Sequence, residues 1–137
     1  LLNGAFEQGV KLGGDGSNLV VFGYCFGGAA VLEIARSGAE AKAVVTFHGG
    51  LSTPEGQDYS NASGSIVVFH GTADTAITMD DFASLAAELE STGVGHEMVT
   101  YSGAPHAFTV FGSKRYHELS DKKSWERFLK LLEDTLT

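Results

Sequence analysis

The sequence predicts an α/β fold with a mostly parallel sheet covered by helices on both faces. Apolar runs at 19–22, 43–47 and 66–70 alternate with segments of helical periodicity along the chain. Each run is apolar throughout, which is typical of strands buried on both faces of a parallel sheet. With 137 residues, of which 43% are hydrophobic, the chain is expected to form a single domain over residues 1–137 with a buried core.

The amino-terminal half is predicted to run helix, strand, helix, strand. The strand at 19–22 leads into a helix at 26–36, whose first turns carry small residues that allow close packing on the sheet. Ser37-Gly38 ends that helix, and the strand at 43–47 ends at His48-Gly49-Gly50. A short helix at the start of the chain has one apolar face, formed by Leu2, Ala5, Phe6 and Val10.

The carboxy-terminal half is predicted to add two strands and two helices. The strand at 66–70 is followed by a helix that opens with a capping-box pattern, Thr78 with Asp81 three residues later. A weakly alternating strand at 97–101 is expected near an edge of the sheet. The last helix starts near Ser120, and its expected buried stripe consists of Trp125, Phe128, Leu129, Leu132 and Leu136.

Composition excludes several classes of partner. The net charge of -8 disfavours nucleic acid, because the phosphate backbone repels an acidic surface. No apolar run reaches the length of a membrane span, so no membrane partner is expected. The one cysteine cannot form an internal disulfide, which fits a reducing compartment and predicts a cytoplasmic protein. The glycines at 13–16 precede a strand rather than follow one, and no cofactor is expected.

Cys25 lies in a stretch that predicts a sharp strand-to-helix turn. The pattern Gly23-Tyr24-Cys25-Phe26-Gly27 is that of a nucleophile elbow with cysteine in place of serine. Gly23 and Gly27 are expected to leave no room for a Cβ, and the helix dipole favours the thiolate of Cys25. The backbone N–H of Phe26 would stabilise an oxyanion. The alternative is a buried structural cysteine, and this pentapeptide alone does not separate the two.

Asp74 and His106 follow later strands and complete a predicted catalytic set. Taken alone, Asp74 reads as a solvated turn residue and His106 as a surface histidine. However, Cys25, Asp74 and His106 each come just after a strand, and the carboxyl ends of parallel strands share one edge. Nucleophile, acid and histidine also occur in the chain order of the α/β-hydrolase triad, which favours a triad over coincidence.

His48 ends a strand on the same edge of the sheet. It is expected to contact substrate, to brace the loop of Cys25, or to bond backbone at the Gly49-Gly50 turn, and we favour the last. The five histidines lack the spacing of metal ligands and have no second cysteine beside them, so no metal site is expected.

The chain resembles the dienelactone hydrolase family of α/β-hydrolases. The motifs that carry the resemblance are residues 23–28 (GYCFGG), 47–51 (FHGGL), 69–74 (FHGTAD) and 101–108 (YSGAPHAF). The resemblance implies an α/β-hydrolase-like three-layer sandwich with Cys25 as nucleophile, His106 and Asp74 as its partners, and Phe26 supplying one oxyanion N–H. The family's earlier strands have no counterpart here, which implies an N-terminally truncated domain.

We therefore expect a hydrolase that cleaves an ester or lactone through a Cys25–His106–Asp74 triad, as carboxymethylenebutenolidases do. One alternative is a thioesterase that uses the same triad. Another is a non-catalytic α/β-hydrolase-like protein that acts in binding or assembly. The expected partner is a small-molecule ester or lactone. Missing strands would also leave a sheet edge uncovered, through which the chain would self-associate.

Overall fold

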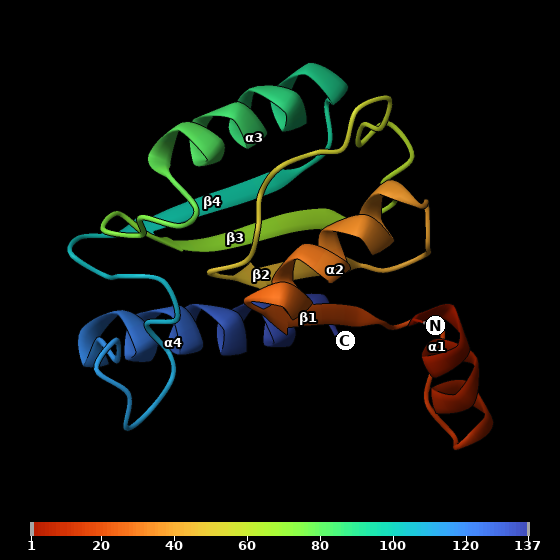
Figure 1. Ribbon diagram of the computed structural model, residues 1–137. Coiled ribbons are helices and arrows are strands. Elements are labelled where there is room, and N and C mark those ends of the chain that lie inside the picture. The colour runs from red at the N-terminus through yellow and green to blue at the C-terminus, as the bar shows by residue number, and fades with distance from the viewer. Residues whose placement is uncertain (1, 137) are drawn as a thin grey trace.

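The computed structural model describes residues 2–136, which form a parallel sheet with helices on both of its faces (Figure 1). The sheet has four strands in the order β1-β2-β3-β4, and every neighbouring pair is parallel. The strands are β1 (Val20–Tyr24), β2 (Ala43–Phe47), β3 (Ser65–Gly71) and β4 (His96–Tyr101). The helices are α1 (Leu2–Lys11), α2 (Phe26–Arg36), α3 (Met79–Thr92) and α4 (Glu118–Thr135).

The sheet separates two apolar cores, because successive side chains of a strand point to opposite faces. On one face, Val44, Ile66 and Val68 pack under α2 and α3. On the other, Val45, Phe47, Val67 and Phe69 pack against Phe128 and Leu131 of α4. Figure 1 shows these elements, with α2 and α3 on one side of the sheet and α4 on the other. The predicted three-layer α/β arrangement is confirmed.

The local signals at helix ends and strand positions are mostly confirmed. The Thr78 hydroxyl accepts from the Asp81 N–H while the Asp81 carboxylate accepts from the Thr78 N–H, so the capping box at the start of α3 is present. The strand predicted at 97–101 is β4, an edge strand. In α1, Phe6 packs against the first core and Val10 is exposed, while the side chain of Leu2 lies outside the described residues.

The predicted apolar stripe of α4 is partly wrong. Phe128 is buried, but Trp125 and Leu129 are 44% and 43% exposed, and the buried leucine is Leu131. The physical reason is the rotation of α4 about its own axis. Ser124, Phe128 and Leu131 face the sheet, and Trp125 and Leu129 lie on the flank of the helix. Phe22 of β1 is also 47% exposed, and its ring lies 4.9 Å from the Phe128 ring between centroids.

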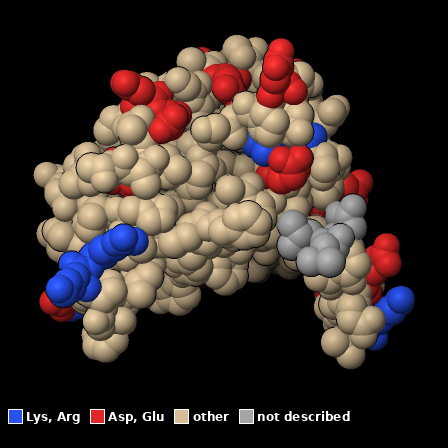
Figure 2. Space-filling model, viewed as in Figure 1, with Lys and Arg blue, Asp and Glu red and all other residues tan. Residues whose placement is uncertain are grey.

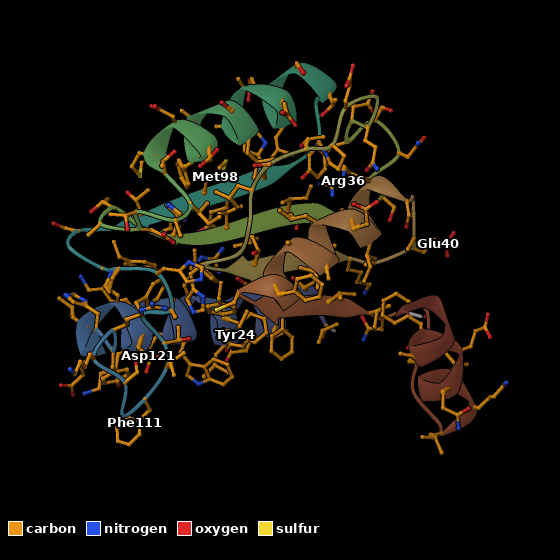
Figure 3. The ribbon with its side chains drawn as sticks, viewed as in Figure 1. Tyr24, Arg36, Glu40, Met98, Phe111 and Asp121 are labelled. Carbon is orange, nitrogen blue, oxygen red and sulfur yellow. The ribbon has the colours of Figure 1, made fainter. Side chains whose placement is uncertain are left out.

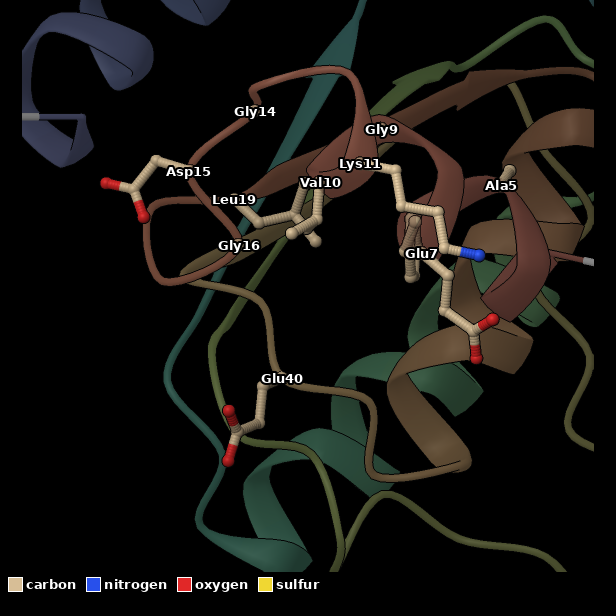
Figure 4. Close-up of a pocket in the computed structure, with 11 residues that line it drawn as sticks. Ala5, Glu7, Gly9, Val10, Lys11, Gly14, Asp15, Gly16, Leu19 and Glu40 are labelled. Carbon is tan, nitrogen blue, oxygen red and sulfur yellow. The ribbon is translucent and has the colours of Figure 1, made fainter.

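Figure 2 shows acidic residues over α3, which contributes Asp80, Asp81, Glu88 and Glu90, and an uncharged region across the middle of this view. An open apolar pocket lies between α1 and the residues just before β1, including Phe6, Val10 and Leu19 (Figure 4). This pocket is at the amino ends of the strands. No helix among residues 2–136 is long and apolar enough to cross a membrane.

Candidate active site

Cys25 stands alone between β1 and α2, in a backbone conformation that side chains rarely adopt. Its φ is 49° and its ψ is -117°. A Cβ on Gly23 would lie 2.2 Å from the carbonyl oxygen of Gly27, so the turn requires glycine at position 23. A Cβ on Gly27 would meet nothing within 4 Å, so the requirement expected there is wrong. The second close approach is at Gly28, where a Cβ would lie 2.4 Å from Thr46 Oγ1.

Backbone hydrogen bonds attach this turn to the neighbouring strand. The Cys25 N–H donates to the carbonyl of Phe47 at 3.1 Å, and the His48 N–H donates to the carbonyl of Phe69 at 2.8 Å. Phe26 is the first residue of α2, so its own N–H has no acceptor within the helix and points beyond the helix end. An N–H group without an acceptor inside the helix is available to an oxyanion, and the catalytic role of the Phe26 N–H stays a prediction.

Asp74 and His106 meet at the carboxyl ends of β3 and β4, as predicted. The Nδ1 of His106 lies 2.8 Å from Oδ2 of Asp74. The other oxygen, Oδ1, accepts from the N–H groups of Ala76 and Ile77 at 2.9 Å each. Burial raises the pKa of the Asp74 carboxyl, but these N–H donors and His106 outweigh it, and the pKa is held below its usual range. The ionised carboxylate fixes Nδ1 of His106 as the protonated nitrogen and leaves Nε2 free.

The Cys25 thiol contacts His48 in this structure. The distance from Cys25 Sγ to His48 Nδ1 is 3.3 Å, and His48 Nε2 lies 2.8 Å from Thr109 Oγ1. One donor atom each from Cys25, His48 and His106 lie within 4.8 Å of one another. The two ring nitrogens of His48 thus contact Cys25 and Thr109, and the contact with Cys25 fits the alternative of bracing its loop rather than the favoured bond to backbone at the Gly49-Gly50 turn.

The register of β1 and β2 explains why His48 lies beside Cys25. Tyr24 of β1 is paired with Phe47 of β2, so the next residues of the two strands, Cys25 and His48, fall side by side. The spacing of histidines along the sequence does not reveal this neighbourhood. In the same way, register and loop folding bring Cys25 and two histidines together although they are far apart in the chain.

The backbone of the site is strained. Among residues 2–136, the non-glycine residues with positive φ are Cys25 at 49°, His48 at 40° and Ala107 at 62°, next to His106. Such conformations cost on the order of 1–3 kcal/mol each and persist where the surrounding structure enforces them. Two of them belong to this cluster and the third is next to His106, so the strained positions of the described residues gather at the site.

Electrostatics at the site favour neutral groups in the resting state. Burial, and then the charge of Asp74, raise the pKa of the Cys25 thiol, while Arg115 acts in the opposite direction. Burial, and then His106, lower the pKa of His48 to about 4, so its ring is neutral near pH 7. The resting form is therefore a thiol, and the thiolate expected from the helix dipole has to be generated by proton transfer.

Other aromatic and histidine side chains frame the cluster. Phe108 is fully buried and lies 5.0 Å from the His48 ring between centroids. His70 is also fully buried, stacks on Phe82 at 5.5 Å, and has a pKa lowered mainly by burial. Phe26 and Phe111 are exposed, and Figure 3 shows Phe111 on the loop before α4, pointing away from the sheet.

Comparisons with known proteins identify relatives of this chain. A protein from Salmonella typhimurium, provisionally named a carboxymethylenebutenolidase, is 28% identical over 125 residues, which cover 85% of this chain and 46% of the relative. The chain thus spans about half the length of the relative it matches.

Solved structures give the same result. A crystal structure from Klebsiella pneumoniae, provisionally described as a dienelactone hydrolase, has a TM-score of 0.89 at 26% identity and covers 96% of this chain and 58% of its own. A dienelactone hydrolase-like promiscuous phosphotriesterase from metagenomic libraries has a TM-score of 0.81 at 31% identity, covering 90% and 54%. A sequence model of the dienelactone hydrolase family matches residues 10–136. The chain therefore belongs to the dienelactone hydrolase family.

Proposed function

We propose that this chain carries the nucleophile, base and acid of a hydrolase that cleaves esters or lactones through an acyl-cysteine intermediate. The observation that carries the proposal is the placement of Cys25 on a strained elbow near His106, whose Nδ1 is bonded at 2.8 Å to the buried Asp74. A nucleophile beside a histidine that a third group orients is the arrangement that covalent catalysis requires.

The proposed reaction starts from the neutral thiol. His106 Nε2 takes the Cys25 proton as Sγ attacks the substrate carbonyl, and the Asp74 carboxylate stabilises the resulting imidazolium. The Phe26 N–H donates to the oxyanion of the tetrahedral intermediate. Collapse breaks the carbon–oxygen bond, His106 returns its proton to the leaving alkoxide, and an acyl-thioester remains. Water, deprotonated by His106, then attacks the thioester and releases the acid and the Cys25 thiol.

His48 has a different proposed role from His106. Its pKa of about 4 makes it a poor store for the thiol proton, whereas His106 has a carboxylate partner. Its Nδ1 lies 3.3 Å from Sγ and its ring is held by Thr109 on the other side. His48 therefore holds the resting thiol in place, and the thiol turns from His48 toward His106 and substrate in the reaction.

The surroundings of the thiol favour a largely uncharged acyl group. The exposed Phe26 side chain adjoins the nucleophile in sequence, and Tyr24 is partly exposed at the end of β1. Four uncharged residues, 109–112, follow shortly after His106, and Arg115 is the cation that lowers the pKa of Cys25. We infer small-molecule esters and lactones as substrates, and a free Cys25 thiol fits a reducing compartment such as the cytoplasm. Among residues 2–136 no strand pairs with the outer edge of β1, and this edge is the basis on which we propose self-association of the chain.

Steady-state hydrolysis by the full-length protein tests the proposal. The panel contains p-nitrophenyl esters, five- and six-membered lactones, acyl thioesters and a phosphotriester. We expect turnover of esters or lactones that is abolished in Cys25→Ala, with His96→Gln at the far end of β4 as a matched control. Turnover retained in Cys25→Ala would overturn the assignment. Absence of turnover on the whole panel, with an unreactive thiol, would favour the binding protein.

A further inference from the structure

We propose that Cys25, His48 and His106 form a binding site for a thiophilic divalent cation, with Zn²⁺ as the best fit, and that the bound cation blocks the thiol. One donor atom from each side chain lies within 4.8 Å of the other two. Sulfur with imidazole nitrogen is a ligand set that suits Zn²⁺, and three protein ligands leave a fourth position for water.

The distances are close to those of a tetrahedral site. With zinc–sulfur bonds of about 2.3 Å and zinc–nitrogen bonds of about 2.0 Å, neighbouring ligand atoms in a tetrahedron are roughly 3.3–3.6 Å apart. Cys25 Sγ and His48 Nδ1 are already 3.3 Å apart. The largest separation between ligand atoms in the cluster is below 4.8 Å. It shortens to the tetrahedral distance if the ligating nitrogen of His106 moves by roughly 1 Å. The His106 side chain is 25% exposed, which leaves it room to do so.

Hydrogen bonds on the far sides of both rings fit them for coordination. Asp74 accepts from Nδ1 of His106 at 2.8 Å, so Nε2 of His106 presents its lone pair to the cluster. Thr109 Oγ1 lies 2.8 Å from Nε2 of His48, and a hydroxyl can accept, which leaves the lone pair of Nδ1 facing Cys25. A carboxylate or hydroxyl behind a coordinating imidazole is the usual outer contact of a metal-binding histidine.

Charge balance also favours the site. Binding releases the thiol proton of Cys25, because the thiolate is the ligand. The thiolate and the adjacent Asp74 carboxylate together offset the two positive charges of the cation, while both imidazoles stay neutral. The sulfur lone pair that would attack a carbonyl then lies on the metal. Cation binding and formation of an acyl-enzyme are therefore mutually exclusive.

Metal titration of the full-length protein tests this without an activity assay. Titration calorimetry with Zn²⁺ gives the affinity, and Co²⁺ in its place gives a sulfur-to-cobalt charge-transfer absorption if Cys25 is a ligand. We expect Cys25→Ser to remove the absorption and His48→Gln to weaken Zn²⁺ binding at least tenfold. Thr109→Val should weaken it about tenfold by removing the acceptor behind His48. His96→Gln, a histidine outside the cluster, should change neither.

Several results would overturn the proposal. Zn²⁺ affinity unchanged in Cys25→Ser or in His48→Gln, or equal losses in His96→Gln, would place any bound cation elsewhere. Where circular dichroism shows that a variant is unfolded, the proposal is tested on the native protein by alkylation of its thiol. Cys25 is the sole cysteine, so its alkylation by iodoacetamide should slow at least tenfold with saturating Zn²⁺ and recover with chelator. Alkylation at an unchanged rate would contradict the site, whatever the outcome of the ester assays.

Discussion

Gly23→Ala should destabilise the protein strongly, because the turn at Cys25 has no space for one more methyl group. A Cβ at position 23 would lie 2.2 Å from the Gly27 carbonyl oxygen and 2.9 Å from the Gly28 nitrogen. A relaxed contact is longer by at least about 1 Å, so the first turn of α2 has to move by that distance. Movement of backbone is costlier than rotation of a side chain, and we expect a loss of about 3 kcal/mol or more.

Gly27→Ala is the matched control, since it makes the same chemical change four residues away. A Cβ there meets nothing within 4 Å, and position 27 lies inside α2. Alanine is favoured over glycine in a helix by about 1 kcal/mol, so this variant should be neutral or slightly stabilised. Urea unfolding, followed by circular dichroism, gives both free energies. Equal stability of the two variants would refute the close approach of β1 and α2 on which the site depends.

Three further predictions concern charge at the site. Asp74→Asn should lower kcat by roughly 10³- to 10⁴-fold with little change in fold, because the amide no longer fixes the His106 tautomer; an unchanged kcat measured by ester hydrolysis would contradict this. Because the His48 pKa is lowered to about 4, its share of stability is complete above its ordinary pKa of 6.5 and is lost as the pH falls toward 4. Urea unfolding at pH 7 and pH 5 should show about 2 kcal/mol of this loss in the native protein but not in His48→Gln. The raised pKa of Cys25 predicts that alkylation accelerates only above the usual thiol range, and a rate already at its plateau near pH 7 would show a preformed thiolate.

The parts of the fold that depend on local pattern were predictable. The apolar runs gave three of the strands, and Thr78 with Asp81 marked the start of α3. Asp74 and His106 could be placed together because carboxyl ends of parallel strands share an edge, and their 2.8 Å contact follows from that topology.

The features that depend on strand register and on the packing of helices against the sheet could not be predicted from the sequence. The contact of His48 with Cys25 arises from the pairing of Tyr24 with Phe47, which no local pattern encodes. The exposure of Trp125 and Leu129 depends on which face of α4 lies on the sheet, and the helical period alone does not settle this. The neutral resting state of the Cys25 thiol likewise depends on burial and on its neighbours in the folded protein.

Cys25 should form a covalent bond to the acyl group of the substrate. Mass spectrometry after rapid acid quench, during turnover of a slowly hydrolysed p-nitrophenyl ester, measures this directly. We predict a mass increase equal to the acyl group on the peptide that contains Cys25, removable by hydroxylamine, and neither adduct nor turnover in Cys25→Ala. Turnover that persists in Cys25→Ala, with no acyl group on the native thiol, would contradict the claim.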